Sequence, residues 1–289
     1  MDAANPSATV TFANRTPLRI GAVGLKARDL GLLTDFYNQA IGLDILDRDA
    51  KTTRLGAGGV TLLELEAAPD ALPDDPRTAG LYHTAFLQPT RADLARWLVH
   101  VARHRVPLSG ASDHLVSEAI YLDDPEGNGI EVYRDRLPEE WRWNGDRIQM
   151  ATDRLDLDNL AADAANTSYA GAPAGLRVGH IHLRVGNLVP TQEFYGLVGL
   201  APTAGRGGAL FMSSGRYHHH VGTNVWHSNG AGPRDDNRAG LSWFAVEGDS
   251  ANERDAAVAR LKDAKVPLTD SALGKEARDP FGTRVRFTN

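Results

Sequence analysis

The chain has 289 residues, a formal net charge of -6 and no cysteine. Its length is typical of about two domains, and its 42% hydrophobic and 24% charged residues indicate a compact globular protein rather than a disordered one. The acidic balance, without a long run of Lys or Arg, argues against nucleic acid as a partner. The missing thiols exclude disulfides and leave His and carboxylate side chains as the residues that would hold a metal.

The first residues show no secretion signal, and no segment approaches the roughly 20 apolar residues that span a bilayer. We therefore expect a cytoplasmic protein with no membrane partner. Residues 1–16 are expected to form a flexible arm.

One succession of elements recurs four times along the chain. In unit 1, about 17–68, a strand over Arg19–Lys26 precedes an amphipathic helix over Leu30–Ala40, and short strands follow. Unit 2, about 79–136, repeats this order with a strand over Leu81–Leu87 and a helix over Arg91–His104. Units 3 and 4, about 177–226 and 239–289, match units 1 and 2 in turn. Each unit is predicted to be βαβββ.

Two short motifs mark the repeat. Phe36-Tyr37 followed by Gly42-Leu43 matches Phe194-Tyr195 followed by Gly199-Leu200, and a D-P-x-G turn begins at both Asp124 and Asp279. Residues 137–175 fit no unit and are predicted to be a linker with a short helix around Leu155–Ala165 and a Trp pair against a domain surface. The prediction is an α+β fold of two sheet-lined domains, 17–136 and 176–289.

Four βαβββ units with these motifs resemble the vicinal oxygen chelate superfamily, the glyoxalase/bleomycin resistance/extradiol dioxygenase fold. The resemblance implies open sheets around a cleft, with metal ligands on the first and last strand of each unit. The first-strand positions are Ala22, His83, His180 and Trp243, and the last-strand positions are Leu62, Glu131, His219 and Arg286. Units 2 and 3 therefore hold all the candidate ligands.

His83, His180 and Glu131 would form a 2-His-1-carboxylate triad, which suits non-haem Fe(II) because it leaves coordination positions open. His219 would then be free to act as an acid or base. A single strand histidine is weak evidence, but three histidines and a glutamate on repeat-equivalent positions are harder to assign to packing alone. His218 and His220 are reserve candidates, because a one-residue change of register would exchange the faces of this strand.

The segment from 112 to 136 resembles the signature of type I extradiol ring-cleavage dioxygenases, and more narrowly a bacterial catechol-2,3-dioxygenase-like group. Its spacing runs from His114 through Ile120 and Tyr121 and the turn at Asp124 to Glu131. The resemblance implies Glu131 as a ligand, with His114 and Tyr121 bonding the substrate oxygens. It also points to His219, in "RYHHHVG", as the acid-base residue and to His180, in "VGHIHL", as a ligand, with His182 as the fallback.

The signature departs from the family in one respect. In two-domain extradiol enzymes the iron lies between units 3 and 4, whereas here the signature is in unit 2 and unit 4 carries Trp243 and Arg286. The simplest resolution is that unit 2 pairs with unit 3, and unit 1 with unit 4, which gives one site per chain; the second possibility is that units from two subunits share a site.

The predicted function is extradiol cleavage of a catechol-type substrate with O2 at Fe(II), with Mn(II) as the other metal considered and a homo-oligomer as a further expectation. A glyoxalase-type lyase or isomerase remains an alternative. It would usually have a second carboxylate ligand and no need for His114 or Tyr121. A non-catalytic aromatic-binding protein of the same superfamily is the other alternative.

Overall fold

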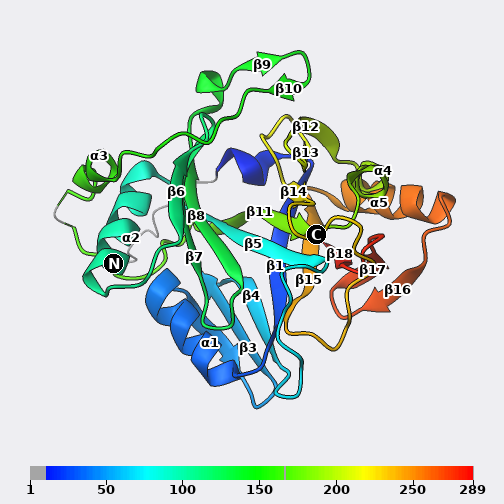
Figure 1. The fold of residues 1–289 in the computed structure, drawn as a ribbon, viewed down its shortest axis with the longest axis horizontal. Helices are drawn as coiled ribbons and strands as arrows, with labels where there is room; N and C mark the ends of the chain where they lie inside the picture. The colour runs from blue at the N-terminus through cyan, green and yellow to red at the C-terminus, as the bar shows by residue number, and fades with distance from the viewer. Residues whose placement is uncertain (1–10, 166, 289) are drawn as a thin grey trace, which may run out of the picture.

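A computed structural model describes residues 11–165 and 167–288. Their strands form two eight-stranded sheets, with the helices at the periphery and a separate two-stranded hairpin above the sheets (Figure 1). No helix in the described part of the chain is long and apolar enough to cross a membrane.

The four predicted units are present, each with a strand, a helix and three further strands. Unit 1 contains β1 (Leu18–Ala27), α1 (Leu30–Phe36) with the π-helical turn η2 (Tyr37–Ile41), β2 (Asp44–Arg48), β3 (Thr52–Ala57) and β4 (Val60–Ala67). Unit 2 contains β5 (Gly80–Leu87), α2 (Arg91–Arg103), β6 (Gly110–Asp113), β7 (Ser117–Asp123) and β8 (Gly129–Asp135). Unit 3 contains β11 (Arg177–Arg184), α4 (Leu188–Val198), β12 (Ala201–Arg206), β13 (Ala209–Ser213) and β14 (Val221–Asn224). Unit 4 contains β15 (Gly240–Gly248), α5 (Ala251–Asp263), β16 (Leu268–Ser271), β17 (Gly274–Arg278) and β18 (Arg284–Thr288).

Each sheet combines units from opposite halves of the chain. One sheet has the order β16-β17-β18-β15-β1-β4-β3-β2, which is units 4 and 1, and the other has the order β12-β13-β14-β11-β5-β8-β7-β6, which is units 3 and 2. The first strands of the paired units run antiparallel, β1 beside β15 and β5 beside β11. This pairing satisfies the backbone groups that each unit would otherwise expose along an open edge.

The predicted α+β fold is confirmed, and unit 2 does pair with unit 3 within one chain. Neither half of the sequence forms a sheet of its own. The division into domains 17–136 and 176–289 therefore stays a prediction about folding units and does not describe the sheets.

The two repeat motifs have a clear structural purpose. Gly42 and Gly199 end their helices in the left-handed conformation, with φ of 82° and 114°, which glycine adopts without a steric penalty. The tyrosine of each motif reaches the other unit of its half: Tyr37 donates to Asp124 Oδ2 at 3.0 Å, and Tyr195 donates to Asp279 Oδ2 at 3.1 Å. All four residues are buried. These bonds join the two sheets to each other.

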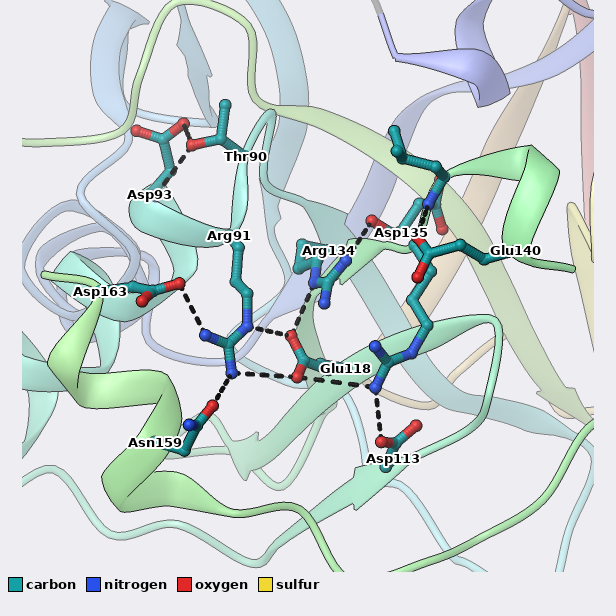
Figure 2. A network of polar contacts seen from close by, with 12 residues as sticks. Thr90, Arg91, Asp93, Asp113, Glu118, Arg134, Asp135, Glu140, Asn159 and Asp163 are labelled. Atoms are coloured by element: carbon teal, nitrogen blue, oxygen red, sulfur yellow. Dashed lines mark hydrogen bonds and ion pairs between the residues drawn. The ribbon is translucent and has the colours of Figure 1, made fainter.

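The linker packs against unit 2 instead of extending into solvent. It contains the 3-10 turn η3 (Pro138–Glu140), the hairpin β9 (Trp143–Asn144) and β10 (Arg147–Ile148), and the helix α3 (Leu157–Ala162) inside the expected stretch. Arg91 of α2 bonds Asn159 and Asp163 at 2.8 and 2.6 Å, and it also bonds the buried Glu118 of β7 at 2.8 Å (Figure 2). The network holds α3 against unit 2.

Part of the expected arm, residues 1–10, lies outside the described residues. The rest forms a 3-10 helix, η1 (Phe12–Arg15), and it is packed rather than free: Ala13 and Thr16 are each 1% exposed. Phe12 meets the ring of Trp141 edge-on at 5.6 Å. Trp141 is thus buried in an apolar cluster, because this turn covers it.

Candidate metal centre and its cavity

Three strands that lie side by side bring the predicted ligands together. His83 is on β5, Glu131 on β8 and His180 on β11, and β5 hydrogen-bonds to both of the others. Glu131 Oε2 lies 3.1 Å from His83 Nε2 and 3.3 Å from His180 Nε2, and the two imidazole nitrogens are 3.3 Å apart. All three side chains are buried, and among the described residues they form a group whose donor atoms could hold a metal ion.

The donor set fits a divalent cation. Bonds of about 2.1 Å to one ion would hold neighbouring ligand atoms about 3.0 Å apart at right angles and about 3.4 Å apart at a tetrahedral angle, and the three separations fall in that interval. Without a cation, two imidazoles that both donate to Glu131 would turn their N–H groups toward each other. Two imidazoles and one carboxylate are a set that Fe(II) and similar metals accept.

The protonation states favour metal binding, since ligands must be deprotonated at their donor atoms. Burial lowers the pKa of His180 to about 4, so this imidazole is neutral near pH 7. Burial alone would raise the pKa of Glu131, but the attraction and hydrogen bonds of His180 and His83 bring it well below its usual value. His180 Nδ1 is buried with no partner in the described part of the chain.

His219 is the member of the histidine run that reaches the cavity. Its ring lies 4.1 Å from the ring of His180, between centroids, and burial holds its pKa well below the usual range. It precedes β14 by two residues instead of lying on that strand as predicted, because the turn at Gly215 and Arg216, both at positive φ, delays the strand. His218 and His220 are fully buried away from the cavity, and His220 bonds Thr16 at 3.2 Å.

His114 and Tyr121 form a connected pair on the other side of the triad. The carbonyl of Ala151 accepts from His114 Nδ1 at 2.7 Å, which places the ring proton on Nδ1 and lets Nε2 accept from the Tyr121 hydroxyl, also at 2.7 Å. Burial and the neighbouring charge of Glu131 raise the pKa of Tyr121 well above its usual value. Tyr121 therefore remains a phenol at neutral pH.

The six predicted site residues line one cavity of about 1330 Å³. Their roles stay predictions, but one chain places them around a single space. The fallback residue His182 lines it too, with its Nε2 accepting from the Asn224 amide at 3.1 Å, outside the converging ligand group.

Several walls of this cavity were not predicted from sequence. Tyr82 and Trp226 meet edge-on at 5.3 Å beside His182, and Phe211 lies 4.9 Å from the ring of His219. The linker hairpin supplies Arg147, Ile148, Gln149 and Met150 as a further wall. Tyr82 directly precedes His83 in the sequence, and this closeness was a usable signal for the first group. No local pattern ties the hairpin to the cavity.

The equivalent positions of the other sheet are closed by Trp243. This side chain is 1% exposed, donates to Glu66 Oε1 at 2.7 Å and lies under the Arg286 guanidinium at 4.1 Å. A Cβ atom on Gly24 would come within 2.2 Å of the indole nitrogen. The indole thus occupies the space where units 1 and 4 would otherwise form a second site.

Comparison with known proteins gives the same superfamily as the repeat motifs. A curated relative, the catechol-2,3-dioxygenase of Bacillus subtilis (strain 168), is 35% identical over 276 residues, which covers 93% of this chain and 96% of the relative. The model of the Glyoxalase/Bleomycin resistance protein/Dioxygenase superfamily matches residues 19–132. The chain belongs to this superfamily.

Solved structures of the superfamily fold agree over almost the whole chain. A protein of Bacillus subtilis subsp. subtilis strain 168 has a TM-score of 0.60 at 14% identity and covers 93% of this chain and 84% of its own. Glyoxalase I from Zea mays has a TM-score of 0.56 at 14% identity and covers 96% and 94%. At such identities these structures support the fold alone, so the reaction must be argued from the site.

Proposed function

We propose that this protein is an extradiol dioxygenase that cleaves a catechol-type ring with O2 at a non-haem Fe(II). The observation that carries the proposal is the convergence of a His83–Glu131–His180 ligand set and three further proton-exchanging side chains on one cavity. The name of the Bacillus subtilis relative, a catechol-2,3-dioxygenase, supports the same reaction.

His83, His180 and Glu131 would hold the metal. Fe(II) is the proposed ion, because three protein ligands leave positions for a chelating diol and O2; Mn(II) suits the same donors. When bound, Fe(II) supplies the redox chemistry that lets triplet O2 react with a closed-shell ring. Two neutral imidazoles and one carboxylate leave a net positive charge that favours an anionic diol.

The polar side chains around the triad would orient the substrate and move its protons. Tyr121 directs its proton toward His114, so its oxygen is available to accept from a substrate hydroxyl. His219 is neutral and lines the cavity, which suits it to take a proton from the diol and return it as the ring opens. The product retains every atom of the diol and of O2.

The aromatic wall would receive the ring and exclude water. Tyr82, Phe211 and Trp226 flank His182 on this side of the cavity. The volume of about 1330 Å³ exceeds the range of about 300–1,000 Å³ that is usual for small-molecule pockets. The site therefore has room for a substituted ring.

The two alternatives fit the site less well. A glyoxalase-type lyase would usually use a second carboxylate ligand, and the metal-ligating group among the described residues has Glu131 alone. A binding protein without catalysis would not need an intact ligand triad beside His114, Tyr121 and His219.

The test is to load the protein with Fe(II) without oxygen, add a series of catechols, admit air and follow the coloured ring-fission product. Product from wild type and none from a Glu131→Gln variant that still folds is the expected result. Wild-type protein with one iron per chain that yields no product from any of the catechols would overturn the proposal.

A further inference from the structure

A line of buried hydrogen bonds runs from strand β8 to the cavity. Asp135 Oδ1 lies 2.7 Å from His218 Nε2, and His218 Nδ1 lies 2.8 Å from His219 Nδ1. His218 is completely buried, whereas His219 lines the cavity beside His180. His218 thus lies behind His219 and is not part of the lining of the cavity.

Strand β8 places the start of this line. Side chains alternate along a strand, so Glu131, Tyr133 and Asp135 share one face. Arg134 points to the other face, where it bonds Glu118 at 2.6 Å (Figure 2). One strand face therefore carries both a proposed metal ligand and the carboxylate behind His219.

The chemistry of the donors decides where the protons sit. A carboxylate only accepts, so His218 must donate to Asp135 through its Nε2–H. With the His218 proton on Nε2, its Nδ1 has a lone pair that accepts from the facing Nδ1 of His219. His219 must carry its own proton on Nδ1, and its Nε2, which has no partner in the described part of the chain, keeps a lone pair.

The surroundings hold His218 in this orientation. Tyr217 donates to Asp135 Oδ1 at 3.1 Å, and the hydroxyls of Tyr133 and Tyr217 are 2.7 Å apart. Trp141 meets the His218 ring edge-on at 5.3 Å between centroids. A flip of the His218 ring would lose both of its ring hydrogen bonds inside a packed cluster, at a cost in unpaired buried groups.

We propose that Asp135 and His218 are positioning residues that fix the tautomer of His219, so that its Nε2 faces the cavity as a proton acceptor. The inference rests on the proposed function for its consequence in catalysis. In that step the substrate O–H bond breaks, an N–H bond forms at His219 Nε2, and the same proton later returns to the product. The bonding pair of the O–H bond stays on the substrate oxygen, and the lone pair of Nε2 forms the new N–H bond. Both changes are reversed when the proton returns.

The direct test needs neither metal nor substrate. Ring-nitrogen NMR of 15N-histidine-labelled protein reports which nitrogen of each neutral imidazole is protonated, and the signals of His219 are assigned by their loss in His219→Ala. Wild type is expected to have His219 protonated on Nδ1, and His218→Phe is expected to lose that preference. His220→Phe removes a neighbouring buried histidine that does not contact His219 by any described hydrogen bond, and it should leave the tautomer unchanged.

A conservative variant separates positioning from packing. In His218→Gln the amide N–H serves Asp135 and the amide oxygen serves His219 Nδ1–H, so the tautomer should be retained. Wild-type protein with His219 protonated on Nε2 overturns the proposal even when no variant folds. So does an unchanged tautomer in a folded His218→Phe protein.

Kinetics with iron-loaded protein then test the catalytic consequence. His218→Phe should lower kcat by at least about tenfold and by no more than the about 10²–10⁴-fold that acid-base catalysis contributes in full, with KM and iron content little changed. Added to His219→Ala, it should cause no further loss, because both act through one residue. A second full loss in the double variant refutes the catalytic part. Absence of all ring cleavage refutes the proposed function and leaves the tautomer result standing.

Discussion

The buried carboxyl of Asp279 should make the stability of this protein fall as the pH rises through the mildly acidic range. Asp279 begins the D-P-x-G turn of unit 4, and its Oδ1 accepts from the backbone N–H groups of Phe281 and Thr283, each at 2.9 Å. Tyr195 donates to Oδ2 at 3.1 Å. Burial raises the pKa of Asp279 to about 6, although these three hydrogen bonds oppose the rise.

The size and sign of this change in stability follow from the pKa of Asp279 in the unfolded and the folded protein. The unfolded chain releases this proton near its ordinary value of 3.8, whereas the folded protein keeps it up to about pH 6. The stabilisation from the neutral carboxyl is therefore complete below about pH 4 and is lost as the pH rises to 6. A difference of about two pH units at about 1.4 kcal/mol each gives about 3 kcal/mol.

Asp279→Asn removes this proton while its amide oxygen can still accept the two backbone bonds. Urea unfolding of both proteins, without metal, should be measured at several pH values from 4 to 7. The free energy of unfolding of the variant relative to wild type should rise by about 3 kcal/mol across that range. Asp44→Asn, at an exposed position on β2, controls for the substitution itself. Parallel curves for wild type and Asp279→Asn would mean that the carboxyl is ionised in the folded protein at pH 4.

Three further changes, together with Gly196→Ala as a control for the last of them, test the site and the closed second cleft. Glu131→Gln should weaken metal binding by more than about 100-fold, since loss of an outer partner alone costs about 10–100-fold, as titration calorimetry would detect; unchanged affinity would remove Glu131 from the ligand set. Tyr121→Phe should lower kcat/KM about 10- to 100-fold at constant metal content, because His114 Nε2 and the substrate hydroxyl are left without a hydrogen-bond partner, and full activity would contradict its role. Gly24→Ala should destabilise by about 1–3 kcal/mol because its Cβ would clash with Trp243. Gly196→Ala, with nothing within 4 Å inside α4, should stabilise by about 0.4–1 kcal/mol; equal melting temperatures for the two would refute the packing argument.

The closed cleft explains why the metal-binding signature lies in unit 2. In the sheet of units 1 and 4, Trp243 fills the space and Glu66 satisfies its indole N–H. The sheet of units 2 and 3 keeps the opposite arrangement, with polar ligands facing an open cavity. The two sheets built from the repeated units thus differ at this position: one fills it with the packed indole of Trp243, and the other leaves it open as the candidate site.

The sequence by itself determined the four βαβββ units, because strand and helix periodicity and helix ends are local properties. The glycines at 42 and 199 end helices through their own backbone freedom, and each D-P-x-G turn closes through hydrogen bonds to its own aspartate. The sequence also placed His83 and His180 on the first strands of their units and Glu131 on the last strand of unit 2, because aligning the repeats gives each residue its matching position in the other units.

Only the tertiary structure decided which units share a sheet, what closes the second cleft and how His219 is held. The Asp135–His218 bond joins residues 83 positions apart. The linker hairpin lines the cavity, and no periodic pattern in its sequence predicts that contact. Such contacts depend on burial and on the geometry of distant segments, which the pattern of any one segment does not contain. The run of three histidines was visible from the start. Packing decided that His218 faces Asp135, His219 faces the cavity and His220 faces Thr16.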